Sequence, residues 1–179
     1  QKEFYDAMDI TMDAFDILGK RFYEMAGEML AKADEPQKKM LERIQKTFAE
    51  CPKKPAFDFY SACAVYVMAF TFDGIDSPGH FDQYMIDFYR KSDPKDARKT
   101  LENLWRFFHR TRTWNLCIGG SDENGNDLTN ELTYEILDVA AAYQFNTPNI
   151  TMRCHRNTPE KLLRKAAATI ATGIGMPVL

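Results

Sequence analysis

A short apolar run that ends in two glycines and leads into a helix constrains this sequence more than any other feature. Residues 114–118 read WNLCI, Gly119 and Gly120 follow them, and residues 121–127 are polar apart from one glycine. An apolar run of this length, bounded by turn formers, predicts a buried strand with a tight turn at its end. The sequence therefore predicts a strand whose carboxyl end opens into a polar loop.

A helix is predicted after this loop, over residues 129–143. Asp127 or Thr129 can cap its first turn. Its apolar stripe repeats at helical spacing, through Leu132, Ile136, Val139 and Ala140. A strand, a loop and a helix make half of a β/α unit, and barrels built from such units place their chemistry at the carboxyl ends of the strands.

The chain before this unit, residues 1–112, is predicted to be helical. Most of its segments keep an apolar residue at every third or fourth position, or begin with a cap and a proline. The predicted helices span residues 3–33, 36–50, 57–72, 81–91 and 94–111.

Residues 113–179 are predicted to form a βαβαβ segment, which implies parallel strands joined by helical crossovers. A second strand is predicted over residues 149–154. The helix after it is expected to have Thr158 as its cap, Pro159 in its first turn and Gly173 as its stop. The apolar end of the chain, residues 176–179, resembles the start of a third strand.

The composition excludes several classes of protein. Of the 179 residues, 45 % are hydrophobic and 27 % are charged, which is typical of a globular domain, and the net charge of −3 disfavours a nucleic-acid surface. No apolar run approaches the length of a membrane span, and no signal peptide is recognisable. Four scattered cysteines without a CxxC pair indicate reduced thiols and a cytoplasmic location: Cys51, Cys63, Cys117 and Cys154.

Common catalytic and binding motifs are missing from the sequence. The glycines at 119–120 match neither GxGxxG nor a P-loop, and the three histidines lack partners at metal-binding spacing. Cys117 is interpreted as a small core thiol. Arg153 and His155 share one face and are expected to cap helix ends or to bind loop carbonyls. The loop carboxylates are expected to be solvated or capping: Asp122, Glu123, Asp127 and Glu131.

The sequence of residues 119–138, GGSDENGNDLTNELTYEILD, resembles a segment of glycyl radical enzymes. In that family, which includes pyruvate formate-lyase-like proteins, choline trimethylamine-lyase, glycerol dehydratase and fumarate-adding hydrocarbon synthases, the segment runs GG, Asp, Gly, a hydrophobic residue or Ala, and Thr-Asn-Glu-Leu. Residues 77–84 resemble the family's Gly-Arg-x-Asp-Gln segment, with His80 where Arg is common. The family's Pro-Asn, Arg-x-His, Thr-Pro and Gly-x-Gly-x-Pro elements correspond to residues 148–149, 153–155, 158–159 and 173–177.

The resemblance implies an α/β fold, namely a fragment of the ten-stranded β/α barrel of glycyl radical enzymes that is predominantly helical in this portion. Residues 1–179 are then expected to be an internal fragment of one barrel domain, because a helical pattern already runs at Phe4 and the last residues are apolar. The family's thiyl-cysteine and radical-glycine motifs are not found. They are expected to lie C-terminal to this segment, so no catalytic residue is predicted within it and the segment alone is expected to be inactive.

The sequences of residues 72–85, 114–120 and 152–163 are most similar to those of the catalytic subunit of alkylsuccinate or benzylsuccinate synthase. That resemblance implies addition of an alkane or a toluene-type hydrocarbon to fumarate. One alternative is another glycyl radical lyase or dehydratase, of the choline, diol, glycerol or formate-lyase type. The second alternative is a non-enzymatic helical interaction domain.

The resemblance also implies cofactors and partners. No bound cofactor or metal is expected. A glycyl radical is expected in the C-terminal part of the polypeptide, installed by an activating radical-SAM enzyme. The implied partners are a hydrocarbon and fumarate as substrates, the activating enzyme, small accessory subunits and further copies in a homo- or hetero-oligomer, with no nucleic acid and no membrane.

Residues of the strand at 114–118 are the candidates for substrate contact. Alternation along a strand allows only one set to face a cavity, either Trp114, Leu116 and Ile118 or Asn115 and Cys117. The apolar set would suit a hydrocarbon, and the set with Asn115 and Cys117 would suit a small polar substrate.

Overall fold

The structure is a computed structural model that describes residues 1–74 and 76–179. Ile75 lies outside the described residues; it belongs to segment 72–85, one of those that resemble the succinate synthases. The chain divides into two compact units, Gln1–Gly74 and Ile75–Leu179, and each is described by itself. No described helix is both long and apolar enough to cross a membrane.

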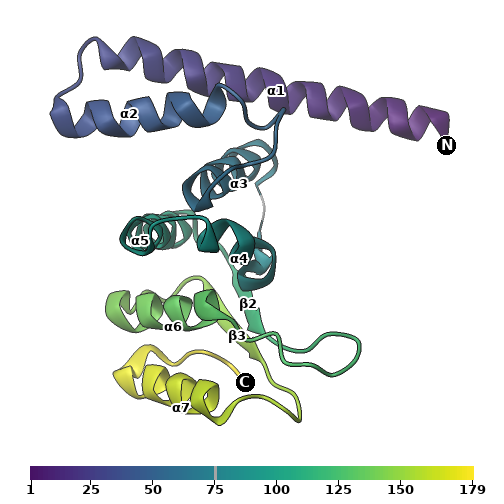
Figure 1. Cartoon of the computed structure of the whole chain (residues 1–179), viewed down its shortest axis with the longest axis vertical. Coiled ribbons are helices and arrows are strands. Elements are labelled where there is room, and N and C mark those ends of the chain that lie inside the picture. The colour runs from purple at the N-terminus through teal and green to yellow at the C-terminus, as the bar shows by residue number, and fades with distance from the viewer. Residues whose placement is uncertain (75) are drawn as a thin grey trace. The chain divides into compact units, whose positions relative to one another are not determined.

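The unit Gln1–Gly74 is helical, as predicted. Its described elements are α1 (Lys2–Leu30), α2 (Glu35–Phe48) and α3 (Phe59–Asp73) (Figure 1). Asp34 caps α2 and Asp58 caps α3, each in a reciprocal capping box with the residue three positions later. These caps explain why the two helices begin one or two residues from their predicted starts.

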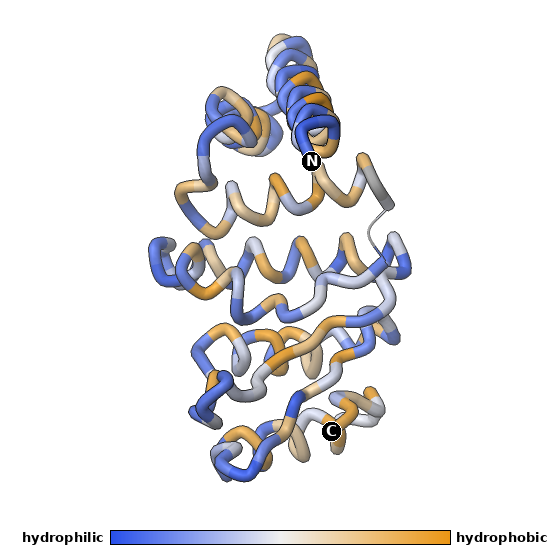
Figure 2. Tube along the Cα trace, turned by 90° about the vertical axis from the view of Figure 1, so that its right-hand side faces the viewer, coloured by the Kyte–Doolittle hydropathy of each residue, from blue (hydrophilic) through white to orange (hydrophobic). Residues whose placement is uncertain are grey.

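Helix α1 packs on α2 and its following turn through a glycine. A side chain at Gly19 would place its Cβ 2.9 Å from Cδ of Pro52 and 3.0 Å from the Cys51 carbonyl oxygen, so only glycine allows this approach. Both hydrophilic and hydrophobic segments are visible on α1, whose start is marked N in Figure 2. Many of its large apolar side chains are exposed: Phe4, Met8, Ile10, Met12, Ile17, Met25 and Met29.

The second unit alternates strands and helices. Its described elements are β1 (Gly79–His80), α4 (Phe81–Arg90), α5 (Pro94–Thr111), β2 (Asn115–Gly119), α6 (Glu131–Tyr143), β3 (Asn149–Arg153), α7 (Glu160–Thr169) and the π-helical turn η1 (Ile170–Ile174). The strands described within residues 76–179 form one three-stranded parallel sheet in the order β1-β2-β3. The prediction of an interior parallel strand that ends at the glycine pair is confirmed.

The predicted start of a further strand at residues 176–179 is confirmed as a single parallel bridge between Val178 and Thr151. The Met152 N–H donates to the Val178 carbonyl and the Val178 N–H donates to the Ile150 carbonyl, both at 2.8 Å. The end of the described chain therefore lies beside β3 and extends the parallel arrangement.

The core of this unit collects the apolar stripe of α6 and one face of the strands. Leu116, Ile118 and Ile150 are fully buried. The predicted stripe of α6 is also fully buried and is therefore confirmed: Leu132, Ile136, Val139 and Ala140. Burial of such side chains stabilises the unit by about 1.5–3 kcal/mol each, as an upper estimate.

Two predicted caps are wrong. Helix α6 begins after Asn130, whose side chain accepts the Thr133 N–H in a reciprocal capping box, whereas the Thr129 hydroxyl donates to the carboxylate of Asp127. Helix α7 begins after Pro159, and the hydroxyl of Thr158 instead accepts the His155 N–H at 2.8 Å.

Candidate functional site

The candidate site lies at the carboxyl ends of the parallel strands. His80 ends β1, Gly119 ends β2 and Arg153 ends β3. The strands run in the same direction, so these three residues meet at one edge of the sheet. The loop over residues 121–130 leaves from the same edge.

The register assigns each strand residue to one of two faces. Cys117 pairs with His80 on one side and with Thr151 on the other, Asn115 pairs with Asn149, and Gly119 pairs with Arg153. Paired residues of neighbouring strands point to the same face. This face, here called the polar face, therefore carries Asn115, Cys117, His80, Asn149, Thr151 and Arg153.

The two predicted sets of candidate residues are separated by this arrangement. Leu116 and Ile118 are 0 % exposed and belong to the core face, whereas Asn115 and Cys117 are half-buried on the polar face. Trp114 precedes the strand and is 62 % exposed, and its carbonyl accepts the Asn149 N–H. Which set contacts a substrate stays a prediction.

Asn115 has a defined orientation on the polar face. The Thr151 hydroxyl donates to its Oδ1 atom at 3.0 Å, which turns its Nδ2 atom toward Sγ of Cys117, 3.9 Å away. The hydroxyl of Ser77 donates to the Asn115 carbonyl. The amide therefore presents a fixed pattern of donor and acceptor groups to this face.

Arg153 crosses the end of β2 to reach His80 on β1. Its Nη1 atom lies 3.2 Å from Nε2 and 3.4 Å from Nδ1 of the His80 ring. A Cβ at Gly120, where φ is +102°, would lie 3.3 Å from both Cβ and Nη1 of Arg153. The glycine pair therefore leaves the space through which the guanidinium passes.

Asp82 anchors the end of β2 from the buried side, and the sequence analysis did not single it out. Its Oδ2 atom accepts the Gly119 N–H at 2.8 Å and the Thr133 hydroxyl at 2.5 Å, while its buried Oδ1 atom has no partner among the described residues. Burial is the main cause that raises the pKa of Asp82 above its ordinary value, against these hydrogen bonds. The sequence feature that could have indicated Asp82 is its position within residues 77–84, which resemble the family's Gly-Arg-x-Asp-Gln segment.

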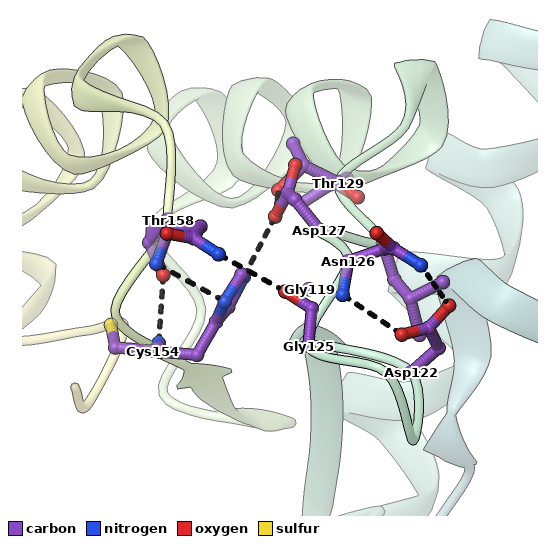
Figure 3. Close-up of polar contacts among 12 residues, drawn as sticks. Gly119, Asp122, Gly125, Asn126, Asp127, Thr129, Cys154 and Thr158 are labelled. Carbon is purple, nitrogen blue, oxygen red and sulfur yellow. Dashed lines mark hydrogen bonds and ion pairs between the residues drawn. The ribbon is translucent and has the colours of Figure 1, made fainter.

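The loop after the glycine pair is organised by one carboxylate. Asp122 Oδ1 accepts the backbone N–H groups of Asn124 and Asn126, and its Oδ2 accepts the Asn126 side-chain amide at 2.8 Å (Figure 3). The side-chain amide and then the backbone N–H of Asn126 hold the pKa of Asp122 below its usual range. Asp122 thus builds the turn, whereas Glu131 pairs with Arg90 at 2.8 Å.

A histidine joins this loop to the end of β3. Nε2 of His155 lies 3.0 Å from Oδ1 of Asp127, which also accepts the Thr129 hydroxyl at 2.8 Å. The Asn157 N–H points at Nδ1 of His155, so the network assigns the ring proton to Nε2. The prediction that Arg153 and His155 cap helix ends or bind loop carbonyls is wrong. The guanidinium of Arg153 contacts the His80 ring on β1, and the His155 ring contacts the carboxylate of Asp127 in the loop.

The described residues contain no cluster of three or more His, Cys, Asp or Glu side chains that could hold a metal ion. All four cysteines are free thiols, and burial is the main cause that raises the pKa of Cys51 and Cys63. This edge of the sheet presents the guanidinium of Arg153, the His80 ring and the hydrogen-bonding groups of Asn115 and Thr151.

Comparisons with known proteins agree on one family. The family model described as "Pyruvate formate lyase-like" matches residues 1–179. The isethionate sulfite-lyase of Nitratidesulfovibrio vulgaris is 29 % identical over 210 residues, which cover 100 % of this chain and 25 % of that protein. The chain thus spans about a quarter of the length of this relative.

Solved structures share the fold. A glycyl radical enzyme from Archaeoglobus fulgidus superposes with a TM-score of 0.83 at 26 % identity, over 96 % of this chain and 26 % of that one. The hydroxyproline dehydratase of Clostridioides difficile, solved with trans-4-hydroxy-L-proline bound, superposes with a TM-score of 0.82 at 28 % identity, over 91 % of this chain and 25 % of that one.

Proposed function

This chain belongs to the pyruvate formate lyase-like family and its fold is part of the β/α barrel of glycyl radical enzymes, and on that premise we propose that it forms one wall of the substrate cavity in a glycyl radical lyase or dehydratase. The substrate is small and polar. In this proposal both compact units belong to the same barrel domain of the longer polypeptide.

The polar face of the sheet is the observation that supports this proposal. Leu116 and Ile118, which would suit a hydrocarbon, are fully enclosed by the protein. A substrate could reach them only if the core opened. Asn115 and Thr151 are half-buried on the opposite face and are already joined by a hydrogen bond. A wall made of amide, hydroxyl and guanidinium groups suits a substrate with hydroxyl or charged groups.

The comparisons favour the same reading over addition of a hydrocarbon to fumarate. The named relatives are a sulfite-lyase of isethionate and a dehydratase of hydroxyproline. Each acts on a small polar compound, which agrees with the alternative of a polar lyase or dehydratase. The match of the family model over the whole chain also disfavours a non-enzymatic helical domain.

The residues of this chain bind and orient the substrate in the proposed enzyme. A glycyl radical elsewhere in the polypeptide would supply hydrogen abstraction when an activating enzyme has installed it. Asn115 and Thr151 would hold a substrate hydroxyl by hydrogen bonds and so orient the carbon that bears it. Oriented binding of this kind lowers the activation free energy because the reacting atoms are already held in position.

The test is a substrate panel with the full-length, activated enzyme under anoxic conditions. The polar compounds are isethionate, trans-4-hydroxy-L-proline and 1,2-propanediol, and the comparison reactions are toluene or hexane with fumarate. We expect turnover of at least one polar compound and no substituted succinate. Formation of a substituted succinate, without turnover of any polar compound, would refute the proposal.

A further inference from the structure

We propose that Arg153 and His80 form a binding site for the anionic group of the substrate, a sulfonate or a carboxylate. This inference rests on the proposed function and names the class of substrate: a short hydroxylated organic anion. It is carried by the geometry at the carboxyl ends of β1 and β3.

The positions of the two side chains suit a ligand on the polar face. His80 lies level with Cys117 and Thr151 in the register, and Arg153 lies level with Gly119. Because Gly119 and Gly120 have no side chains, the guanidinium of Arg153 lies over the end of β2, and its Nη1 atom is 3.2 Å from Nε2 of His80. Both side chains are exposed at this edge.

The pair has no carboxylate to neutralise it among the described residues. Arg90, Arg98 and Arg164 of the same unit each bind a glutamate, whereas within the described part of the chain Arg153 makes its polar contacts with His80. Asp82 interacts electrostatically with His80, but its Oδ2 atom is directed to Gly119 and Thr133 on the buried side. The positive charge of Arg153 is therefore open to a ligand.

The donor geometry favours an oxyanion. A guanidinium presents five N–H groups in a planar fork, and in Arg153 the described residues engage Nη1 alone. Its remaining N–H groups can bind two oxygens of one carboxylate or sulfonate. His80 supports the guanidinium from the side and can itself donate one ring N–H to the same anion.

Arg153 shares the polar face with the hydroxyl and amide groups of Thr151 and Asn115. Arg153 and Thr151 are two residues apart on one face, which corresponds to about 6–7 Å along a strand. An anion bound by Arg153 would lie on the same face as the hydrogen-bonded side chains of Thr151 and Asn115, which can bind a hydroxyl of the same ligand. Short compounds that carry both an acidic group and a hydroxyl group match these two kinds of binding group.

Binding measurements on the full-length enzyme before radical installation test the site. The probes are isethionate and 3-hydroxypropanoate as anions and 1,2-propanediol as a neutral polar compound, titrated calorimetrically. We expect the Arg153→Gln substitution to weaken anion binding at least tenfold and to change binding of the neutral compound less than twofold. Arg153→Lys, which keeps the charge but loses the fork, should give an intermediate loss, and His80→Gln a smaller one.

Arg156→Gln is the matched control, because it removes an exposed arginine three residues away and should leave both kinds of probe unaffected. Equal loss of anionic and neutral binding in Arg153→Gln, together with a lower melting temperature in both Arg153 variants, would overturn the inference, since the contact of Arg153 with His80 would then serve only to stabilise the fold. Wild-type binding of the neutral compound alone would also overturn it and leave the proposed function standing. Binding of none of the three probes, combined with hydrocarbon addition to fumarate, would refute both.

Discussion

The backbone N–H of Gly119 donates a 2.8 Å hydrogen bond to the buried carboxyl group of Asp82, 37 residues earlier in the chain. This contact fixes the end of the central strand relative to the start of α4. The Thr133 hydroxyl donates to the same oxygen, so the start of α6 is held in place by the same carboxyl group. One carboxyl group therefore positions the edge of the sheet from which the polar loop and the glycine pair leave.

Substitutions of Asp82 should separate its charge from its hydrogen bonds. In Asp82→Ala the buried Gly119 N–H loses its acceptor, which costs about 1–3 kcal/mol. Asp82→Asn keeps an acceptor oxygen and places an amide near the Oδ1 position, so it should be the less damaging change. Amide hydrogen exchange of the peptide that contains Gly119 measures the difference, and equal exchange in both variants would contradict it.

The raised pKa of Asp82 also predicts a pH dependence. Because the pKa is higher in the folded than in the unfolded chain, ionisation is less favourable in the folded state. The contribution to stability is greatest below the ordinary aspartate pKa and falls as the pH rises through the folded-state value. Comparison of melting temperatures of wild type and Asp82→Asn across that range checks this, because only the wild type should show this loss.

Gly120→Ala should destabilise the protein and displace Arg153. The substitution forces a side chain into φ +102° and within 3.3 Å of the Arg153 side chain. Backbone strain of this kind costs about 1–3 kcal/mol. Gly125→Ala is the matched control, because its φ is +80° and nothing lies within 4 Å of the added Cβ. Only Gly120→Ala should also weaken anion binding, and a similar effect of both variants on binding would argue against the contact.

His155 and Asp127 should be energetically coupled. Their ring and carboxylate are joined at 3.0 Å and both side chains are largely shielded from solvent. A double-mutant cycle with His155→Ala and Asp127→Ala should give a coupling of about 0.5–3 kcal/mol. Hydrogen exchange of residues 121–127 reports the same link, and strictly additive effects would place the two residues in independent roles. Thr129→Ala serves as the control that removes only the second partner of Asp127.

Asn115→Leu should reduce activity toward a polar substrate without a loss of stability. The substitution removes the half-buried amide and leaves the buried neighbours Leu116 and Ile118 in place. Loss of one hydrogen bond to the substrate predicts about a 3- to 10-fold fall in kcat/KM. Thr151→Val, which removes the hydroxyl that orients the amide and can also bind the substrate, should cause a fall of similar size.

Leu116→Trp distinguishes the two faces. The side chain is fully buried, so a larger residue should overpack the core at a cost of about 1–3 kcal/mol rather than change the size of the accepted substrate. Melting temperature and the ratio of kcat/KM for long and short substrates measure the two effects separately. A changed ratio of kcat/KM at an unchanged melting temperature would indicate instead that Leu116 lines the substrate cavity.

The sequence by itself determined the local elements and the family. The apolar run at 114–118 and the stripe from Leu132 to Ala140 specified a buried strand and an amphipathic helix, since each periodicity matches one geometry. The motif at residues 119–138 identified the superfamily, which the family comparison bears out. Alternation also determined that Leu116 and Asn115 point to opposite faces.

Only the tertiary structure decided which face is the core and which side chains meet at the strand ends. Alternation is symmetric between the two faces, so burial of Leu116 rather than Asn115 follows from the elements packed around the strand. Contacts such as Asp82 with Gly119 and Arg153 with His80, 73 residues apart, depend on strand order and register, which leave no local periodic signal. The cap of α6 was settled similarly, because Asn130 binds the Asp82 carbonyl as well as its own helix.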